Sequence, residues 1–419
     1  MLRRTRRVVI TGLGVIAPNG IGKEAFWDAL VAGKSGIDYI SAFNPRSYPC
    51  HVAGEVKGFT PTDFMSVRTA KHAGRFAHLA VAAARLAVDD SKLRLQDERP
   101  GRVLTCVGNA MNGSGDVYET ARLGFEKSGM AGIPQLSGVE FAAHAALGHV
   151  SKELGLRGQG MTIASACSTG LDVTQWAAAQ IHENRADVVV AGSTEAPISE
   201  FCFATLCAFG SISTFNDPPL LASRPFDRKR EGLVLGEGAA IFVLEELEHA
   251  LDRRANIYAE IAGFGSGSEG TNSNRMAVRC DALSHAITEA VTTAGITVGQ
   301  IDYFNAHGNA MKDYDRVDTD AFRSVLGSRA YGVPISSIKS MIGHAMGAAA
   351  ALQVAATCLT ISHSLIPPTI NYEFRDPECD LDYVPNQART SRVRTALINA
   401  HAIGGTYSAL VLKSPTPSD

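Results

Sequence analysis

The chain has 419 residues, a formal net charge of −3 and 45% hydrophobic residues, enough to fill two ordinary domains or one large duplicated one. It contains no run of about 18 apolar residues and no signal-peptide pattern, so we expect a globular, cytoplasmic protein without a membrane segment. The basic residues between positions 3 and 7 have no interleaved aromatic residues. Together with the negative net charge, this argues against nucleic-acid binding.

The eight cysteines are scattered through the chain, at positions 50, 106, 167, 202, 207, 280, 358 and 379. None belongs to a CxxC pair, and no Cys/His cluster has the spacing of a zinc site. We therefore expect neither disulfides nor a structural metal.

The first half of the chain is predicted to alternate strands and helices. Its first strand, Arg7–Thr11, runs into Gly12-Leu13-Gly14 as a dinucleotide-binding loop would, but Pro18 follows too soon for a helix to receive a pyrophosphate. The strand-helix-strand order favours a parallel sheet covered on both faces. The other predicted elements are helices at Lys23–Ala32, Arg68–Asp90 and Gly138–Leu154, strands at Arg102–Gly108, Ala186–Gly192 and Ala239–Glu245, and a loop at Gly108–Gly115.

The second half resembles the first in its order of elements. A strand at Ile257–Gly265 again ends in a Gly-x-Gly sequence, and a helix at Ala345–Ile361 follows a histidine much as an earlier helix follows a cysteine. We therefore predict an internal duplication, with one half at residues 1–255 and the other at 256–419. The remaining elements expected here are a helix at Ala282–Ala294 and strands at Tyr303–His307, Arg394–Asn399 and Ser408–Lys413.

One cysteine, Cys167, is predicted to lie where a strand becomes a helix. The strand is expected to end at Met161–Ala164, and the apolar positions of Asp172–Ile181 share one helical face. At a helix N-terminus, free backbone N–H groups and the helix dipole stabilise an anion, so the thiol is expected to ionise more readily than usual. The alternative is a small buried core residue, the common fate of a free cysteine.

Two histidines, His307 and His344, are also expected at the ends of strands. His344 opens a glycine-rich helix, where the helix dipole disfavours an imidazolium, so we expect a neutral ring able to donate one N–H to an oxyanion. One thiol and two neutral imidazoles suit acyl transfer. The thiolate takes an acyl group as a thioester, while the imidazoles bind the carbonyl oxygen of a second, decarboxylating thioester.

The chain resembles the condensing enzymes of the β-ketoacyl synthase family over nearly its whole length. The motifs that carry the resemblance are VVITGLGVIAPNG, ACSTGLD at Cys167, RPFD, GLVLGEGAA, NAHG at His307, KSMIGHAMGAAA and the Gly404-Gly405-Thr406 loop. The resemblance implies a duplicated thiolase-like α-β-α-β-α five-layer sandwich, normally dimeric. It also implies catalytic roles for Cys167, His307, His344 and Lys339, and an oxyanion hole formed by the backbone N–H groups of Cys167 and Ile403.

Within the family, the segment Asp376–Arg389 is similar to the ketosynthase alpha subunits of bacterial type II polyketide synthases. Such subunits act on acyl carrier protein and pair with a chain-length factor, and no cofactor beyond the carrier's phosphopantetheine is implied. Three alternatives stay open: a homodimeric fatty-acid elongation synthase, a non-catalytic scaffold subunit, and a thiolase. A thiolase needs a second cysteine near the C-terminus, and Cys379 lies before the terminal loop, which counts against it.

Several positions depart from the family pattern. Two hydroxyl residues that bind pantetheine are replaced by Asn309 and Met311, and the usual supporting glutamate by Asp318, while Asp315 matches the family's aspartate. In the terminal loop, His401 and Ile403 stand where phenylalanines are common, and Gly404 follows them. A smaller gate at Ile403 predicts a different acyl-chain selection. By analogy, Met111 is expected to line the acyl pocket, and Lys339 is expected to find a partner in Asp315 or Asp318.

Overall fold

The computed structural model of the protein describes residues 6–111, 114–270 and 279–415. Within these ranges an 11-stranded sheet runs in the order β11-β10-β14-β15-β9-β1-β8-β7-β5-β6, with β2 paired to β1. Strands of the two halves meet at its middle, where β1 pairs with β9. The strands are β1 (Val8–Ala17), β2 (Gly20–Ile21), β5 (Val103–Gly108), β6 (Gly160–Met161), β7 (Val188–Glu195), β8 (Gly238–Glu246), β9 (Ala259–Ser268), β10 (Tyr303–Asn305), β11 (Ile335–Ser336), β14 (Thr395–Ala402) and β15 (Thr406–Lys413).

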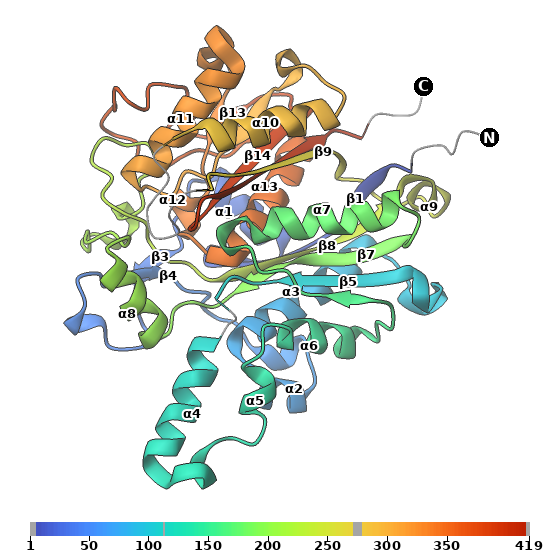
Figure 1. Ribbon diagram of the computed structural model, residues 1–419, viewed down its shortest axis with the longest axis vertical. Helices are drawn as coiled ribbons and strands as arrows, with labels where there is room; N and C mark the ends of the chain where they lie inside the picture. The colour runs from blue at the N-terminus through green and yellow to red at the C-terminus, as the bar shows by residue number, and fades with distance from the viewer. Residues whose placement is uncertain (1–5, 112–113, 271–278, 416–419) are drawn as a thin grey trace.

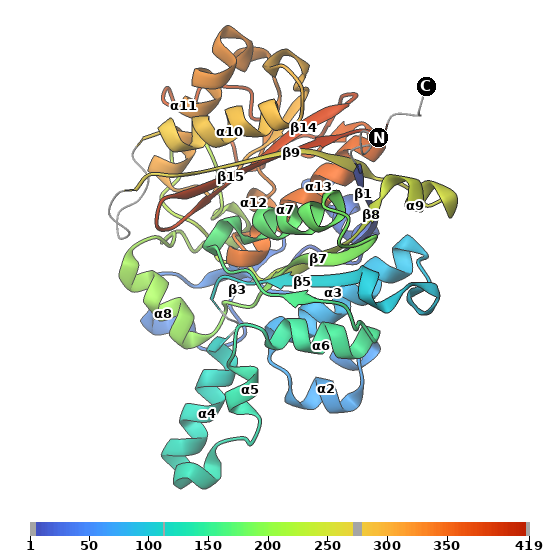
Figure 2. The same cartoon turned by 45° about the vertical axis from the view of Figure 1, so that its right-hand side comes forward.

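Helices form three layers around the two halves of this sheet (Figures 1 and 2). The buried helices α7 (Thr169–His182) and α13 (Ala349–His363) lie between the halves, with α1 (Lys23–Val31) beside them. The outer face of the first half is covered by α3 (Arg75–Ser91) and α6 (Ala145–Leu154), and that of the second by α10 (Asp281–Thr293) and α11 (Lys312–Leu326). The predicted five-layer, thiolase-like sandwich is confirmed.

The Gly-x-Gly pairs of the two halves allow an outer helix to pack closely against the strand that contains each pair. A Cβ at Gly14 would lie 1.8 Å from the carbonyl oxygen of Ala83 in α3, and one at Gly265 would lie 2.1 Å from that of Ala286 in α10. Only glycine allows the outer helix to approach its strand so closely. The first pair also lies inside β1, which continues to Ala17, so it does not form a loop that opens a helix.

The sheet is mixed, so the prediction of a parallel sheet is wrong for its central strands. β5 and β7 are parallel, but β8 runs antiparallel to both β7 and β1. The second half repeats this, with β10 parallel to β14 and β15 antiparallel to β14. The physical reason is the connection: a long segment joins β7 to β8, so the chain is free to return in the opposite direction.

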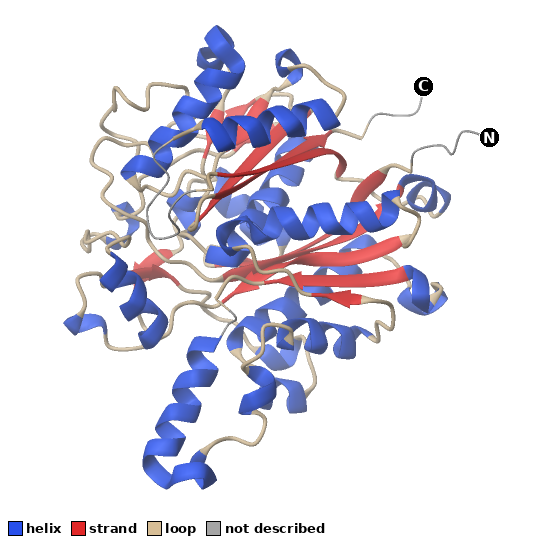
Figure 3. Cartoon of the chain, in the orientation of Figure 1, coloured by secondary structure: helices blue, strands red, loops and turns tan. Residues whose placement is uncertain are grey.

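Some helix predictions need correction (Figure 3). The helix expected at Arg68–Asp90 is two helices, α2 (Val67–His72) and α3, because Ala73 and Gly74 take extended backbone between them. The helix expected at Gly138–Leu154 likewise divides into α5 (Ser137–Glu140) and α6, and the strand end at Met161–Ala164 is only the exposed two-residue β6. Helices α4 (Ser114–Ser128), α8 (Glu200–Phe209) and α11 were not predicted.

One helical stretch, Met346–His363, is long and apolar enough by composition to cross a membrane. It contains α13, and 89% of it is buried inside the fold. Its apolar character is therefore explained by its place between the two halves of the sheet.

Candidate active site

The candidate nucleophile Cys167 lies in a tight turn at the start of a central helix. The 3-10 turn η6 (Ala166–Ser168) leads into α7, and Ala166 adopts a left-handed φ of 51°. The second half repeats this design, since Met346, with a φ of 43°, starts a 3-10 turn that leads into α13. Such strained residues cluster at functional sites. The turn holds Cys167 inside the fold, where 3% of its surface is exposed.

Burial raises the pKa of the Cys167 thiol to about 11, against the effects of the Lys339 charge and of the backbone N–H groups of Ile403 and Cys167 itself. The prediction that this thiol ionises more readily than usual is therefore wrong. The loss of hydration outweighs both the helix N-terminus and the nearby ammonium. The N–H groups of Ile403 and Cys167 each act to lower the pKa of the thiol, and their role as an oxyanion hole stays a prediction.

His307 and His344 lie together, with ring centroids 5.2 Å apart. Burial, and then the charge of Lys339, hold the pKa of both imidazoles well below the ordinary value, so both are neutral. The neutral state predicted for His344 is confirmed, with burial as its main cause. The Met346 N–H donates to His344 Nδ1 at 3.0 Å, which leaves the ring proton on Nε2.

His344 is held by the GLVLGEGAA motif. Its backbone N–H donates to the carbonyl oxygen of Val234 at 2.7 Å, and its carbonyl oxygen accepts from the Gly236 N–H at 3.0 Å. A Cβ at Gly236 would lie 2.4 Å from the carbonyl oxygen of Ile342, so only glycine lets this segment pack directly against the backbone that precedes His344. The motif therefore has a structural role beside the site.

Lys339 is fully buried and bonds to neutral oxygens. Its Nζ donates to the carbonyl oxygen of His307 at 2.6 Å and to Gln353 Oε1 at 2.9 Å. No carboxylate of the described residues lies within ion-pair distance, so the expected direct partner in Asp315 or Asp318 is not found. Burial lowers the pKa of Lys339 to about 8, although both carboxylates act through space to raise it.

Asp315 organises the backbone around His307. Its Oδ1 accepts from the N–H groups of Asn309 at 3.0 Å and Ala310 at 3.2 Å, and its Oδ2 accepts from the Phe226 N–H of the RPFD motif at 2.7 Å. It also pairs with the buried Arg230 at 3.2 Å. Burial raises the pKa of Asp315 to about 6 despite these contacts.

Asp318 contacts three other groups. Its Oδ1 accepts from Asn399 Nδ2 and from His401 Nε2, each at 2.6 Å, and its Oδ2 accepts from the Gly308 N–H at 2.9 Å. In the sequence, His401 and Asp318 are separate departures from the family pattern. Only the fold reveals that they touch.

The predicted pocket residues lie in two groups. Met111 and Met311 pack in the same apolar cluster as Cys167, consistent with an acyl pocket, and Ile403 is half-buried next to the exposed Gly404. Asn309 lies against the histidines: its Oδ1 accepts from the Met311 N–H at 3.0 Å, which turns its Nδ2 toward His307 Nε2 at 3.2 Å.

Glu195, the last residue of β7, is a buried acidic residue near the site. Its Oε2 accepts from the N–H groups of Ala110 at 2.6 Å, Met111 at 3.0 Å and Gly347 at 3.3 Å. It therefore joins the loop that carries Met111 to the turn that precedes α13. Its signal in the sequence was a lone acidic residue ending an apolar strand.

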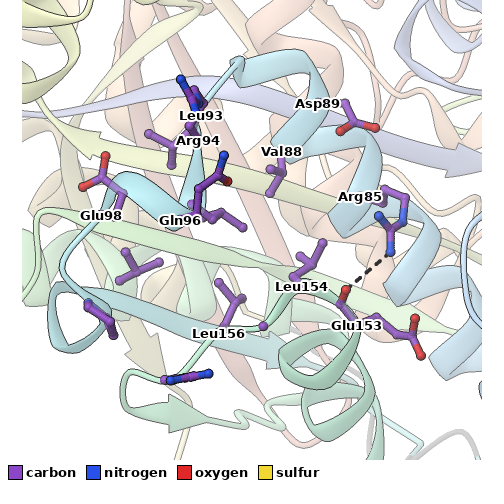
Figure 4. A pocket seen from close by; sticks show the side chains of 15 residues that line it. Arg85, Val88, Asp89, Leu93, Arg94, Gln96, Glu98, Glu153, Leu154 and Leu156 are labelled. Atoms are coloured by element: carbon purple, nitrogen blue, oxygen red, sulfur yellow. Dashed lines mark hydrogen bonds between the residues drawn. The ribbon is translucent and has the colours of Figure 1, made fainter.

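The four candidate catalytic side chains share one buried centre, because the charge of Lys339 acts on Cys167, His307 and His344 alike. A separate surface hollow of 620 Å³ lies beside α3 and α6 and is lined by none of them (Figure 4). Val88, Leu154 and Leu156 line it, with charged residues such as Arg85 and Glu153 around them. Among the described residues, no group of three or more His, Cys, Asp or Glu could hold a metal.

A thiol, two neutral imidazoles and an ammonium, in a duplicated five-layer sandwich, define a thiolase-like condensing enzyme. Comparison with known proteins agrees. The family described as "Beta-ketoacyl synthase, N-terminal domain" matches residues 5–250, and "Beta-ketoacyl synthase, C-terminal domain" matches residues 258–373. The chain belongs to the β-ketoacyl synthase family.

Similar proteins extend over the whole chain. The tetracenomycin polyketide synthase ketoacyl synthase alpha subunit of Streptomyces glaucescens is 43% identical over 98% of this chain and 97% of its own. A 3-oxoacyl-[acyl-carrier-protein] synthase 2 of Coxiella burnetii is 39% identical, covering 97% of this chain and 98% of its own.

Solved structures show the same similarity. The ishigamide ketosynthase/chain length factor structure matches with a TM-score of 0.92 at 33% identity, over 99% of this chain and 100% of its own. A type II polyketide synthase acyl-carrier protein in complex with its ketosynthase bound to the hexaketide matches with a TM-score of 0.91 at 32% identity, again over 99% and 100%.

Proposed function

We propose that this chain is the catalytic ketosynthase subunit of a type II polyketide synthase. Its reaction is a decarboxylative Claisen condensation between an acyl chain on Cys167 and a malonyl group on acyl carrier protein. The observation that carries the proposal is the single buried centre of Cys167, His307, His344 and Lys339. The polyketide pathway is supported by the 43% identity to the tetracenomycin ketoacyl synthase alpha subunit.

In the first step the sulfur of Cys167 attacks the thioester of an acyl carrier protein. The new C–S bond forms as the carrier's C–S bond breaks, and the proton of the Cys167 thiol goes to the departing carrier thiolate. Because the pKa of this thiol is about 11, its proton is lost during the attack rather than before it. The N–H groups of Cys167 and Ile403 stabilise the oxyanion of the tetrahedral intermediate.

In the second step malonyl-carrier protein binds and loses carbon dioxide. His307 and His344, both neutral, donate N–H bonds to the thioester oxygen as it becomes an enolate oxygen. The carbanion then attacks the carbonyl of the Cys167 thioester, forming a C–C bond and expelling the Cys167 thiolate, which takes up one proton from solvent. The product is a β-ketoacyl chain on the carrier.

Lys339 supports this step without forming a bond to the substrate. Its ammonium fixes the carbonyl oxygen of His307 at 2.6 Å and places a positive charge where anions develop. Asp315 and Asp318 hold the backbone that carries His307. The chemistry uses no metal or nucleotide, and the substrates arrive on the phosphopantetheine of the carrier.

The apolar pocket selects the acyl chain. We assign Met111 and Met311 to its lining, and Ile403, with Gly404 beside it, to the gate above Cys167. His401, expected at the gate, is completely buried and packs against His307 instead. Asn309 lies where the pantetheine arm approaches His307. We further propose that residues 1–255 carry the nucleophile and residues 256–419 carry both histidines as two thiolase-like halves of a cytoplasmic enzyme.

The partner is a homologue of the chain-length-factor type. An apolar face on α4, α5 and α8 supports this, since Phe125, Val139, Phe141 and Phe201 are each at least half exposed, at 52%, 58%, 50% and 52%. Tyr118 of α4 and Phe201 of α8 pack with ring centroids 5.2 Å apart and join the helices into one surface. Exposed patches of this kind mark protein interfaces.

A second candidate is a homodimeric fatty-acid elongation synthase, which would perform the same condensation. The 39% identity to a 3-oxoacyl-[acyl-carrier-protein] synthase 2 supports it. The two functions differ in assembly and product. A polyketide subunit needs its homologue to extend a chain repeatedly, whereas a fatty-acid enzyme adds one unit as a homodimer.

Reconstitution tests the proposal. The protein is mixed with its carrier protein and malonyl thioester, with and without the neighbouring homologue, and the products are weighed by mass spectrometry. Chains extended several times only with the homologue support the polyketide function, and single additions without it support fatty-acid elongation. Cys167→Ala is expected to abolish both repeated extension and single addition. Cys358→Ala, which removes a buried thiol from α13, is expected to abolish neither. Unchanged product with Cys167→Ala overturns the catalytic proposal.

A further inference from the structure

A histidine–carboxylate pair, His401 with Asp318, packs against His307. His401, in β14, is completely buried, and its Nε2 donates to Asp318 Oδ1 at 2.6 Å. Its ring stacks on the ring of His307, with centroids 4.8 Å apart and an angle of 13° between the planes. A buried polar ring is costly unless it is hydrogen-bonded, so the contact with Asp318 is what allows an imidazole to occupy this stacking position.

His401 also touches His307 through its backbone. Its N–H faces His307 Nδ1 at 3.3 Å, while the amide nitrogen of Asn309 faces Nε2 at 3.2 Å. A neutral imidazole offers only one acceptor nitrogen, so these two donors compete. His401 contacts His307 with both its ring and its backbone N–H. The contact of this N–H with Nδ1 favours the His307 tautomer that carries its proton on Nε2, from which it can donate a hydrogen bond to a thioester oxygen.

Asp318 fixes both sides of this stack. Besides His401 it accepts from the N–H of Gly308, the residue after His307, and from Asn399 Nδ2. The side-chain oxygen of Asn399 in turn accepts a hydrogen bond from the backbone N–H of His307 at 3.3 Å. One carboxylate thus positions the backbone on either side of His307 and the ring stacked against it.

We propose that His401 is a positioning residue for His307, and that Asp318 holds His401 in place instead of pairing with Lys339. The two residues act as one unit: Asp318 fixes the imidazole of His401, and His401 fixes the ring plane and tautomer of His307 for the decarboxylation step. This rests on the proposed condensing function. It goes beyond that function by giving a role to two residues that differ from the family pattern.

The test is a double-mutant cycle with His401→Phe, Asp318→Asn and the double variant. Phenylalanine keeps a stacking ring but gives up the hydrogen bond, and asparagine gives up the carboxylate charge. Two rates are measured separately: acylation of Cys167 by an acyl-carrier protein, and release of carbon dioxide from malonyl-carrier protein. Thermal unfolding checks that each variant folds.

Each single variant is expected to lower kcat for decarboxylation about tenfold, with KM and the acylation rate unchanged, and the double variant to lose no more than either single one. The control is His149→Phe, which breaks a partly buried histidine–carboxylate pair, His149 with Glu140, at 2.8 Å and away from the site. It is expected to leave both rates intact.

Two results would overturn the inference while the wild type remains active: losses that multiply in the double variant, or an equal fall in acylation, which indicates general damage. If Asp318→Asn does not fold, His401→Phe alone decides, since unchanged decarboxylation contradicts the proposal. A wild type that neither acylates nor decarboxylates would instead refute the proposed function itself.

Discussion

The ammonium of Lys339 donates a 2.6 Å hydrogen bond to the carbonyl oxygen of His307. Lys339 is thus tied to the backbone of a catalytic candidate while its charge lowers the pKa of Cys167, His307 and His344. The site thus places one ammonium beside a thiol and two imidazoles that are neutral at pH 7. This contrast gives the two half-reactions different responses to pH and mutation.

The first prediction is that the two half-reactions depend on pH in opposite ways. Burial lowers the pKa of Lys339 to about 8, so its positive charge is lost as the pH rises through 8, and decarboxylation should slow there. The thiol of Cys167, with a pKa of about 11, stays mostly protonated over the same range, but its small thiolate fraction rises about tenfold per pH unit, so acylation should speed up. Stopped-flow measurement of the rate of each half-reaction between about pH 6 and 10 tests this. The range extends about two pH units on either side of the Lys339 pKa.

Lys339→Met provides the matched comparison. Decarboxylation should fall on the order of a hundredfold and lose its alkaline decline, because a fixed positive charge near the developing anion is removed. A decline above pH 8 that persists in this variant would assign the titration to another group. The groups that face Lys339 from neighbouring elements are Cys167, His307, Asp315, Asp318 and His344.

The second prediction concerns the gate. Ile403→Phe restores an aromatic side chain above Cys167 and should slow acylation by long acyl chains about tenfold, with less effect on acetyl transfer, because the larger ring narrows the entry. Decarboxylation of malonyl-carrier protein should change little. Competition between short and long acyl carriers, followed by mass spectrometry of the Cys167 adduct, measures the selectivity. Equal slowing of all chain lengths would show that Ile403 does not select.

The third prediction concerns Asn309, whose amide faces the catalytic nitrogen of His307 at 3.2 Å. Asn309→Thr removes this competing donor and supplies a hydroxyl for the pantetheine arm, so KM for malonyl-carrier protein should fall about threefold to tenfold at nearly constant kcat. Steady-state kinetics measure the split. If kcat falls and KM is unchanged, Asn309 assists the chemistry and does not compete with the substrate.

The fourth prediction concerns stability. Burial alone would raise the pKa of Glu245, but bonds from Arg253, His249 and Thr11 lower it to about 2, from 4.5. Its folded-state pKa is depressed, so its contribution is complete above pH 4.5 and is lost as the pH falls toward 2. Arg253→Ala leaves this carboxylate buried without its guanidinium and should cost about 3 kcal/mol in the free energy of unfolding at pH 7. Urea unfolding measures this, and a loss below about 0.5 kcal/mol would contradict the buried pairing.

Much of the architecture was predictable because strands such as β7 and β8 are continuous apolar runs and the Gly-x-Gly pairs mark both halves. The missed helix α11 has a charged outer face, but Tyr314, Val317, Ala321 and Phe322 are buried at helical spacing and could have revealed it. The direction of β8 could not be predicted, since a long connection leaves both directions open.

The residues of the site could be predicted from the sequence, but several of their contacts could not. Cys167, His307, His344 and Lys339 stand in motifs, and the structure brings them together. The raised pKa of Cys167 depends on how completely the fold excludes water, which no local pattern reports. The pairing of His401 with Asp318 joins residues far apart in sequence through β14 and α11, so it needed the fold.

The proposed mechanism depends most on Cys167 as the carrier of the acyl chain. Intact-protein and peptide mass spectrometry after incubation with an acyl-carrier protein measures this directly. We predict one acyl adduct, on the peptide that contains Cys167, which disappears when malonyl-carrier protein is added and is replaced by a β-ketoacyl chain on the carrier and free carbon dioxide. An adduct on another residue, or a Cys167 adduct that malonyl-carrier protein leaves in place, would contradict the mechanism.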